Sequence, residues 1–187
     1  MTEPRIVDTN VGIIANDNIG DSIRPPECIR ACAGFIANLM ASGRIVLDFG
    51  WEIISEYKHC MRSPGEPGVG DAFLKWVLTN HANPDRCHKV NINEVVVPME
   101  LTDFDADDHK FIKTAVASPD AQVAQAADSL WWKRRADFDR ANIAVYFLCP
   151  NYIKSLSDRK HGPDANGKTL GYWATAITGQ LPPYAQT

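Results

Sequence analysis

The chain contains 187 residues, of which 45% are hydrophobic and 22% are charged. This length fits one domain of ordinary size, and the composition matches that of soluble globular proteins, which excludes disorder as the main state. The formal net charge of −4 excludes a protein whose whole surface is basic, although a local basic groove for nucleic acid is compatible with it.

The predicted elements alternate between short β-rich runs and longer segments with apolar residues at helical spacing. In chain order they are a strand at 5–9, a helix at 27–40, a strand at 44–48, a helix at 52–61, a Gly- and Pro-rich connector at 63–70, a helix at 71–80, a strand at 90–97, a helix starting near 106, a strand at 122–127, a helix at 129–140 and a strand at 144–149. This alternation predicts a three-layer α/β/α sandwich around a central, mainly parallel five-stranded sheet.

The domain organisation follows from the same pattern. We expect one domain over residues 1–156 and a C-terminal extension over residues 157–187, where glycine and proline become frequent. Four apolar residues in that extension suggest that it packs on the domain or on a partner; they are Leu170, Tyr172, Trp173 and Ile177.

The five cysteines are odd in number and scattered along the chain. No basic segment followed by an apolar stretch opens the chain, and the longest apolar run, 31–41, is far shorter than the roughly 20 residues that a spanning helix needs. We therefore expect a reduced, soluble, cytoplasmic protein without membrane contact. The spacing of Cys28 and Cys32, with Cys87 next to His88, raises the idea of zinc, but Cys32 belongs to an apolar stripe and no C-x-x-C pair occurs, which favours buried thiols.

Carboxylates stand where the predicted fold would bring them to one edge of the sheet. Asp8 and Asp128 follow the first and fourth strands, and ligands of such sheets bind outside the carboxyl ends of the strands. Asp108 is in line with the inward stripe of its helix, at the helix start, and Glu56 borders the inward stripe of the helix at 52–61. We therefore expect Asp8, Glu56, Asp108 and Asp128 to point at one place.

Four converging carboxylates repel one another unless cations neutralise them. Oxygen ligands suit Mg²⁺ or Mn²⁺, and two such ions can activate a water and stabilise the leaving oxygen in phosphodiester hydrolysis. Each acid alone is also typical of helix caps and turns; for example, Asp105 and Asp108 have the spacing of an N-cap and its third helical residue. Only the combination indicates a metal site.

Two other classes of enzyme fit less well. No G-x-x-x-x-G-K-[ST] or G-x-G-x-x-G motif occurs, so nothing indicates a loop that cradles nucleotide phosphates. A phosphatase with an aspartate nucleophile after the first strand would place a second acid two residues later, where this chain has Asn10.

A basic run follows the fourth acid. Lys133, Arg134 and Arg135 come directly after Trp131 and Trp132, so cations and aromatic faces are combined as in sites that bind single-stranded nucleic acid. The alternative interpretation is a solvated basic face over a tryptophan pair that packs in the core.

Several short motifs, in this order, resemble those of PIN-domain nucleases. They are Val7-Asp-Thr-Asn10, Ile53-Ile-Ser-Glu-Tyr57, the segment from Phe104 to Ile112, Ala127-Asp-Ser-Leu130 and a last strand, Val145-Tyr-Phe-Leu-Cys-Pro150. The resemblance covers roughly residues 4 to 156, and it implies an α/β/α sandwich that cleaves single-stranded RNA with Mg²⁺ or Mn²⁺.

The resemblance also implies roles for individual residues. Asp8, Glu56, Asp108 and Asp128 match the acidic quartet as catalytic and metal-binding residues, with Asp107 as the alternative to its neighbour Asp108. Asn10 matches the polar residue that steadies the first aspartate, and Ser129 stands beside the fourth acid as a supporting residue.

The function expected on these grounds is that of a metal-dependent endoribonuclease. Many members of the family are toxins that a cognate antitoxin protein restrains, while others process RNA, and association with a second copy is a further expectation. The alternative is a non-catalytic PIN-like module that binds RNA or a protein partner.

Overall fold

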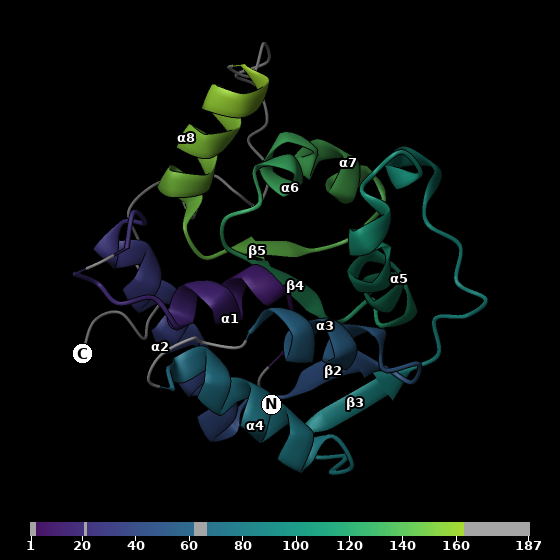
Figure 1. Ribbon diagram of the computed structural model, residues 1–187. Coiled ribbons are helices and arrows are strands. Elements are labelled where there is room, and N and C mark those ends of the chain that lie inside the picture. The colour runs from purple at the N-terminus through teal and green to yellow at the C-terminus, as the bar shows by residue number, and fades with distance from the viewer. Residues whose placement is uncertain (1–2, 21, 62–66, 163–187) are drawn as a thin grey trace.

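The computed structural model describes residues 3–20, 22–61 and 67–162 (Figure 1). Along these residues five strands alternate with helices. The elements are β1 (Arg5–Val7), α1 (Thr9–Ala15), α2 (Pro26–Ser42), β2 (Ile45–Asp48), α3 (Glu52–Cys60), α4 (Val69–Asn80), β3 (Cys87–Val90), the short 3₁₀ turns η1 (Met99–Leu101) and η2 (Ala106–Asp108), α5 (His109–Ala117), β4 (Gln122–Gln125), α6 (Ser129–Lys133), α7 (Arg135–Arg140), β5 (Val145–Phe147) and α8 (Pro150–His161).

The five strands form one sheet in the order β3-β2-β1-β4-β5, and every neighbouring pair is parallel. The predicted α/β sandwich with a central parallel sheet is therefore confirmed. The chain starts in the middle of the sheet, adds β2 and β3 on one side, and then crosses back to add β4 and β5 on the other. The change of direction leaves β1 and β4 as neighbours, with Val7 paired to Ala124.

Helices cover both faces of the sheet (Figure 1). Helices α1, α2 and α4 pack against one another on one side, while α5 lies against β1, β2 and β4 on the other. This arrangement follows from right-handed crossovers, since reversing the direction of travel across the sheet moves the connecting helix to the opposite face. Strand residues between the layers, such as Ile6, Leu47 and Val123, are fully buried. Within the described residues, no helix combines the length and apolar character needed to cross a bilayer.

Two predicted elements differ from the observed ones. The strand expected at 90–97 is instead β3, Cys87–Val90, and the valine-rich segment that follows is a loop in which Val96 is 80% exposed. The helix expected at 129–140 is divided at Arg134, where α6 ends and α7 begins.

Two helices were not expected. Helix α1 begins at Thr9, which the sequence had placed at the end of a strand, directly after the N-cap residue Asp8. Helix α8 runs from Pro150 to His161, so it continues across residue 156, where the domain boundary was expected. The apolar tail residues Leu170, Tyr172, Trp173 and Ile177 lie outside the described residues.

Candidate acidic active site

The sheet order places two of the predicted acids side by side. Asp8 follows β1 and Asp128 comes shortly after β4, and these strands are neighbours in register. The Asp8 backbone N–H donates to the carbonyl oxygen of Ala124 at 3.0 Å, so the ladder continues to the acid itself. Both carboxylates therefore lie at the carboxyl edge of the sheet, where the strand order reverses and ligands bind in such folds.

Each of these two aspartates also caps a helix. Asp8 Oδ1 accepts from the backbone N–H of Asn10 at 2.8 Å, and Asp128 Oδ1 accepts from the N–H of Leu130 at 2.8 Å. Capping satisfies an otherwise unpaired helix N–H and fixes the rotamer of the side chain. In each carboxylate Oδ2 has no hydrogen-bond partner among the described residues, so the capping role and a ligand role are compatible.

Asp108 is held in place by a buried tryptophan. It lies at the junction of η2 and α5, and its Oδ2 accepts from Trp131 Nε1 at 3.1 Å. The Trp131 ring is fully buried and stacks on Phe138, with ring centroids 4.5 Å apart. A rigid aromatic residue of α6 therefore positions the third acid relative to Asp128, which caps the same helix.

Glu56 reaches the cluster from α3. Its Oε1 accepts from Thr9 Oγ1 at 2.5 Å, and its Oε2 forms an ion pair with Lys110 Nζ at 2.5 Å. The next residue, Tyr57, is fully buried and donates its hydroxyl hydrogen to the carbonyl oxygen of Val7. Two consecutive residues of α3 thus tie this helix to the end of β1.

The pKa of Asp8 depends on the charges of the other three acids. Asp8 is 2% exposed, and burial raises its pKa well above the ordinary value of 3.8. The charges of Asp108, Asp128 and Glu56 raise it further, while the N–H of Asn10 opposes the shift. Removing a carboxylate from water and placing others near it both disfavour the charged form. The structure therefore brings the four predicted acids together around Asp8.

Asp108 is perturbed in the same direction. Its pKa rises from 3.8 to about 7, first because of burial and then because of the charge of Asp128; the hydrogen bond from Trp131 partly offsets this. Its neighbour Asp107 is exposed and does not contribute to the shift of Asp8. Of these two adjacent acids, Asp108 is the member of the cluster.

A divalent ion of the Mg²⁺ class fits this set of donors. All four ligand groups are carboxylates, and their mutual repulsion is what a bound cation would relieve. Among the described residues, no three carboxylates bring one oxygen each within 4.8 Å of one another. Mg²⁺ keeps several of its waters and takes only one or two protein carboxylates directly, so wider spacing suits a hydrated ion.

The two supporting residues have contacts of their own. Asn10 steadies Asp8 through its backbone N–H, a contact that any residue except proline could make. Ser129 Oγ hydrogen-bonds His161 Nε2 at 3.1 Å, which joins the start of α6 to the end of α8 rather than to an acid. Three contacts that sequence reasoning missed, from Thr9, Lys110 and Trp131, orient or neutralise the carboxylates more directly.

A further acid near this edge, Asp48, lies outside the cluster. Asp48 ends β2 as Asp8 ends β1, and it is 1% exposed. Both of its oxygens are engaged by the start of α3, since Oδ2 accepts from the N–H of Glu52 at 2.8 Å and Oδ1 from that of Ile53 at 3.0 Å. Asp48 therefore serves to begin the helix that carries Glu56.

Residues 131–135, the two tryptophans and the basic run after them, do not form the arrangement expected for base stacking. Trp131 and Trp132 are 0% and 3% exposed, so their rings belong to the core and are not available to bases. Arg134 is paired with Asp103 and Asp137, and the Arg135 guanidinium lies 4.9 Å from the centroid of the Trp132 ring. The structure thus agrees with the alternative interpretation for the tryptophans.

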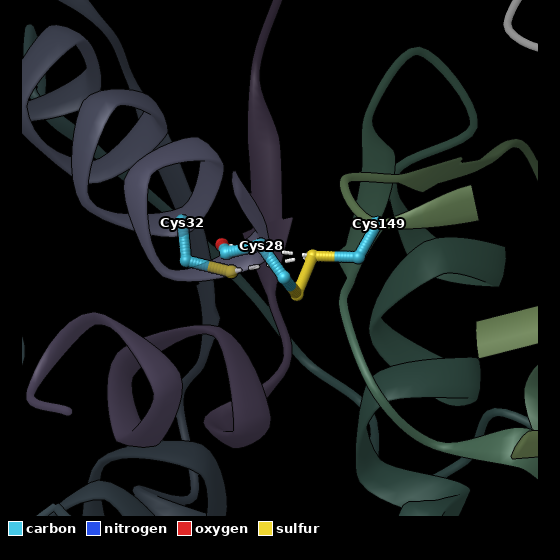
Figure 2. A group of neighbouring side chains, drawn as sticks. All are labelled: Cys28, Cys32 and Cys149. Carbon is cyan, nitrogen blue, oxygen red and sulfur yellow. Dashed lines mark hydrogen bonds between the residues drawn. A yellow bond between two sulfur atoms is a disulfide. The ribbon is translucent and has the colours of Figure 1, made fainter. Parts of the chain in front are cut away.

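A cluster of three cysteines lies at the end of β5 (Figure 2). Cys28 and Cys149 form a disulfide with 5.3 Å between their Cα atoms, and Cys32 Sγ lies 4.0 Å from Cys149 Sγ. The expectation that all cysteines are reduced is therefore wrong for Cys28 and Cys149. Spacing along the chain cannot reveal this pair, because 121 residues separate its members. Cys87, which the zinc idea required, is on β3 and outside the cluster.

Comparisons with protein-family models, curated proteins and solved structures give no match for this chain. A proposal for its function therefore depends on the chemistry of the acidic cluster and on the resemblance of its short motifs.

Proposed function

We propose that the chain is an endoribonuclease that hydrolyses phosphodiester bonds of single-stranded RNA with Mg²⁺ or Mn²⁺. Asp8, Glu56, Asp108 and Asp128 would hold the ion or ions. The observation that carries the proposal is the convergence of these four acids on Asp8, which is buried and destabilised in its charged form by the other three. A fold keeps such a costly arrangement where a cation or a reaction requires it.

The chain's own residues would mainly position the four carboxylates and hold the ion or ions. The strand ends fix Asp8 and Asp128, the Trp131 N–H orients Asp108, and the Thr9 hydroxyl orients Glu56. When bound, Mg²⁺ or Mn²⁺ would supply an activated water as nucleophile and would neutralise charge on the leaving oxygen. Hydrolysis would proceed by direct attack of water, without a covalent intermediate on the protein.

Substrate phosphates would need local positive charge near this edge. Lys133 ends α6, whose first residue comes next to Asp128, and Arg134 and Arg135 join α6 to α7; these three are the cations that we propose for this role. Because Arg134 is engaged by Asp103 and Asp137, a phosphate would have to compete with those carboxylates for it. An antitoxin partner stays a prediction from the resemblance, and a cytoplasmic location and association of two copies stay predictions from the sequence.

Cleavage of labelled single-stranded RNA tests the proposal. Wild-type protein should produce shorter products with Mn²⁺ and none with a chelator. Asp8→Asn and Asp108→Asn should each lower the rate at least about a hundredfold, because each removes a carboxylate that would hold the ion. Asp107→Asn is the matched control, since it neutralises the adjacent exposed acid, and should change the rate less than about twofold.

Folding of the variants is measured alongside. Asp8→Asn should melt at the same or a higher temperature than wild type in chelator, because it relieves the repulsion between one buried carboxylate and its three acidic neighbours. Equal cleavage by wild type and Asp8→Asn would refute the proposed site.

One observation favours the non-catalytic alternative. The Lys110 ammonium already neutralises Glu56, as an internal cation would in a module that had no use for a metal. Such a module would bind the same RNA in chelator and give no Mn²⁺-dependent product, so the assay above separates the two functions.

A further inference from the structure

The three clustered cysteines come from two elements that face each other (Figure 2). Cys28 and Cys32 lie one turn apart on α2, and Cys149 is the N-cap residue of α8. One sulfur from each lies within 4.8 Å of the other two. All three residues are buried, with exposures of 2%, 0% and 5%.

We propose that Cys28, Cys32 and Cys149 form a redox-dependent site for a soft metal ion such as Zn²⁺. The Cys28–Cys149 disulfide is the oxidised, metal-free state. In the reduced state the three thiolates bind the ion together. This inference is independent of the proposed nuclease function, because it uses neither the acidic cluster nor its ions.

The geometry of the sulfurs matches what one ion would require. Two ligands four residues apart lie on one face of a helix and can hold the same ion, as paired histidines do in helical zinc motifs. Two thiolates bound at about 2.3 Å to a tetrahedral Zn²⁺ lie about 3.8 Å apart. Cys32 Sγ and Cys149 Sγ are 4.0 Å apart, close to that value. Only the bonded pair has to separate when the disulfide is reduced.

The surroundings favour a metal over free thiolates. Cys32 is fully buried, and an ion bound to its sulfur takes the place of the thiol proton, so the site does not hold an unpaired thiolate. Thiolate sulfur prefers Zn²⁺ or Cu⁺, whereas carboxylate oxygen prefers Mg²⁺ or Mn²⁺. Cys149 stands at the N-terminus of a 12-residue helix, where the helix dipole further stabilises a thiolate.

Conversion of the oxidised state to the reduced state requires a dithiol reductant. The reductant transfers two electrons and two protons to the Cys28–Cys149 bond and becomes a disulfide itself. Three thiols are then present, and each loses its proton to solvent as its sulfur binds the ion. The reverse sequence releases the ion and requires a disulfide oxidant.

The decisive variant is Cys32→Ser. It removes one proposed ligand and leaves the disulfide partners intact, so it separates the metal site from the disulfide. Cys87→Ser is the matched control, because it removes another buried thiol outside the cluster. The probe is Co²⁺, whose thiolate complexes absorb by sulfur-to-metal charge transfer, and Zn²⁺ competes for the same site.

Full-length protein is titrated with Co²⁺ before and after reduction. Reduced wild type and Cys87→Ser should bind one Co²⁺ per chain with charge-transfer absorption that Zn²⁺ abolishes. Reduced Cys32→Ser should bind at least about tenfold more weakly, as expected on loss of a direct ligand. Unreduced wild type should show no such absorption. The melting temperature of reduced wild type should rise on addition of Zn²⁺, since an ion that binds only the folded state stabilises it.

Three outcomes would overturn the inference. The first is the absence of charge-transfer absorption in reduced wild type. The second is equal affinity of Cys32→Ser and wild type. The third is a reactive-thiol count showing that Cys32→Ser, purified without reductant, lacks the Cys28–Cys149 disulfide, because Cys32 would then be needed for the oxidised state itself.

Discussion

Lys110 is the residue that most changes the character of the acidic cluster. Its ammonium forms an ion pair with Glu56 and also donates to the carbonyl oxygen of Asp107. The side chain is 13% exposed, so the pair is screened little by water. Lys110 therefore supplies one positive charge to a group of four acids, at the Glu56 oxygen that a metal ion would approach on the proposed function.

On the proposed function, replacing this lysine should strengthen metal binding. In Lys110→Gln the Glu56 carboxylate loses its partner, and a divalent ion no longer competes with an ammonium for that oxygen. We expect Mn²⁺ to bind roughly three to ten times more tightly than in wild type, or about 0.7–1.4 kcal/mol, by isothermal titration calorimetry. Lys113→Gln, on the same helix, is the control and should leave the affinity unchanged. Weaker Mn²⁺ binding by Lys110→Gln would contradict this role.

The raised pKa of Asp108 predicts how stability depends on pH. Its value of about 7 in the folded chain exceeds the ordinary 3.8, so between these values the folded state holds a proton that the unfolded state has lost. The contribution of Asp108 to stability is therefore largest below pH 4 and falls as the pH rises toward 7. The shift corresponds to at most about 4 kcal/mol.

Asp108→Asn should remove this dependence. In denaturant unfolding with chelator present, the free energy of unfolding of the variant minus that of wild type should increase between pH 4 and pH 7 and then level off. Asparagine does not titrate, so the variant lacks the pH-dependent loss of stability. The loss of the Trp131 hydrogen bond lowers the free energy of unfolding by nearly the same amount at every pH. A difference that does not change with pH would show that Asp108 is not perturbed.

At the scale of elements, the short helix α1 is held by its crossing with α4. The two helices approach so closely that a Cβ on Gly70 would collide with the backbone carbonyl oxygen of Gly12. The absence of side chains at this crossing lets α4 pack on α1, the helix that Asp8 caps. The position of Asp8 thus depends on the two glycines, Gly12 and Gly70, at the crossing of α1 and α4.

Gly70→Ala should therefore destabilise the protein by about 1–3 kcal/mol, because the methyl group meets backbone that cannot move independently. Gly34→Ala is the matched control, because it adds the same methyl group to a helix at a position with open space around it. Gly34 is exposed inside α2 with no atom within 4 Å of an added Cβ, so alanine there should stabilise by about 0.5–1 kcal/mol. Thermal or denaturant unfolding measures the stability of both variants. Similar effects of the two substitutions would exclude the tight crossing.

The elements that sequence periodicity predicted well are the long amphipathic helices and the buried strands. Helix α2 buries the stripe expected of it, including Ile29, Cys32 and Ile36. The sequence does not indicate helix α1, because its seven residues are mostly apolar and continue a strand, so no polar face marks a period of 3.6. The β-branched residues at 90–97 favour a strand, but most of this segment is a loop in which Val96 is exposed to solvent.

The sequence predicts the candidate site only in part, because a local pattern does not distinguish an acid of the cluster from an acid that caps a helix. An acid at the end of an apolar strand is visible in the sequence, and that pattern identified Asp8 and Asp128. The same pattern at Asp48 leads to a helix cap, and nothing local distinguishes the two cases. The contacts of Glu56 with Thr9 and Lys110 join residues about 50 positions apart, so only the tertiary fold reveals them.

For the whole molecule, the strand order has a consequence for the timing of synthesis. β1 is made first but lies between β2 and β4, so the partner strand that places Asp128 beside Asp8 is made much later. Protein synthesis proceeds from the N-terminus, and the nascent chain cannot complete the acidic cluster until β4 has left the ribosome. On the proposed function, a half-made polypeptide is therefore inactive, and the messenger RNA that encodes it is not exposed to a working nuclease during its own translation.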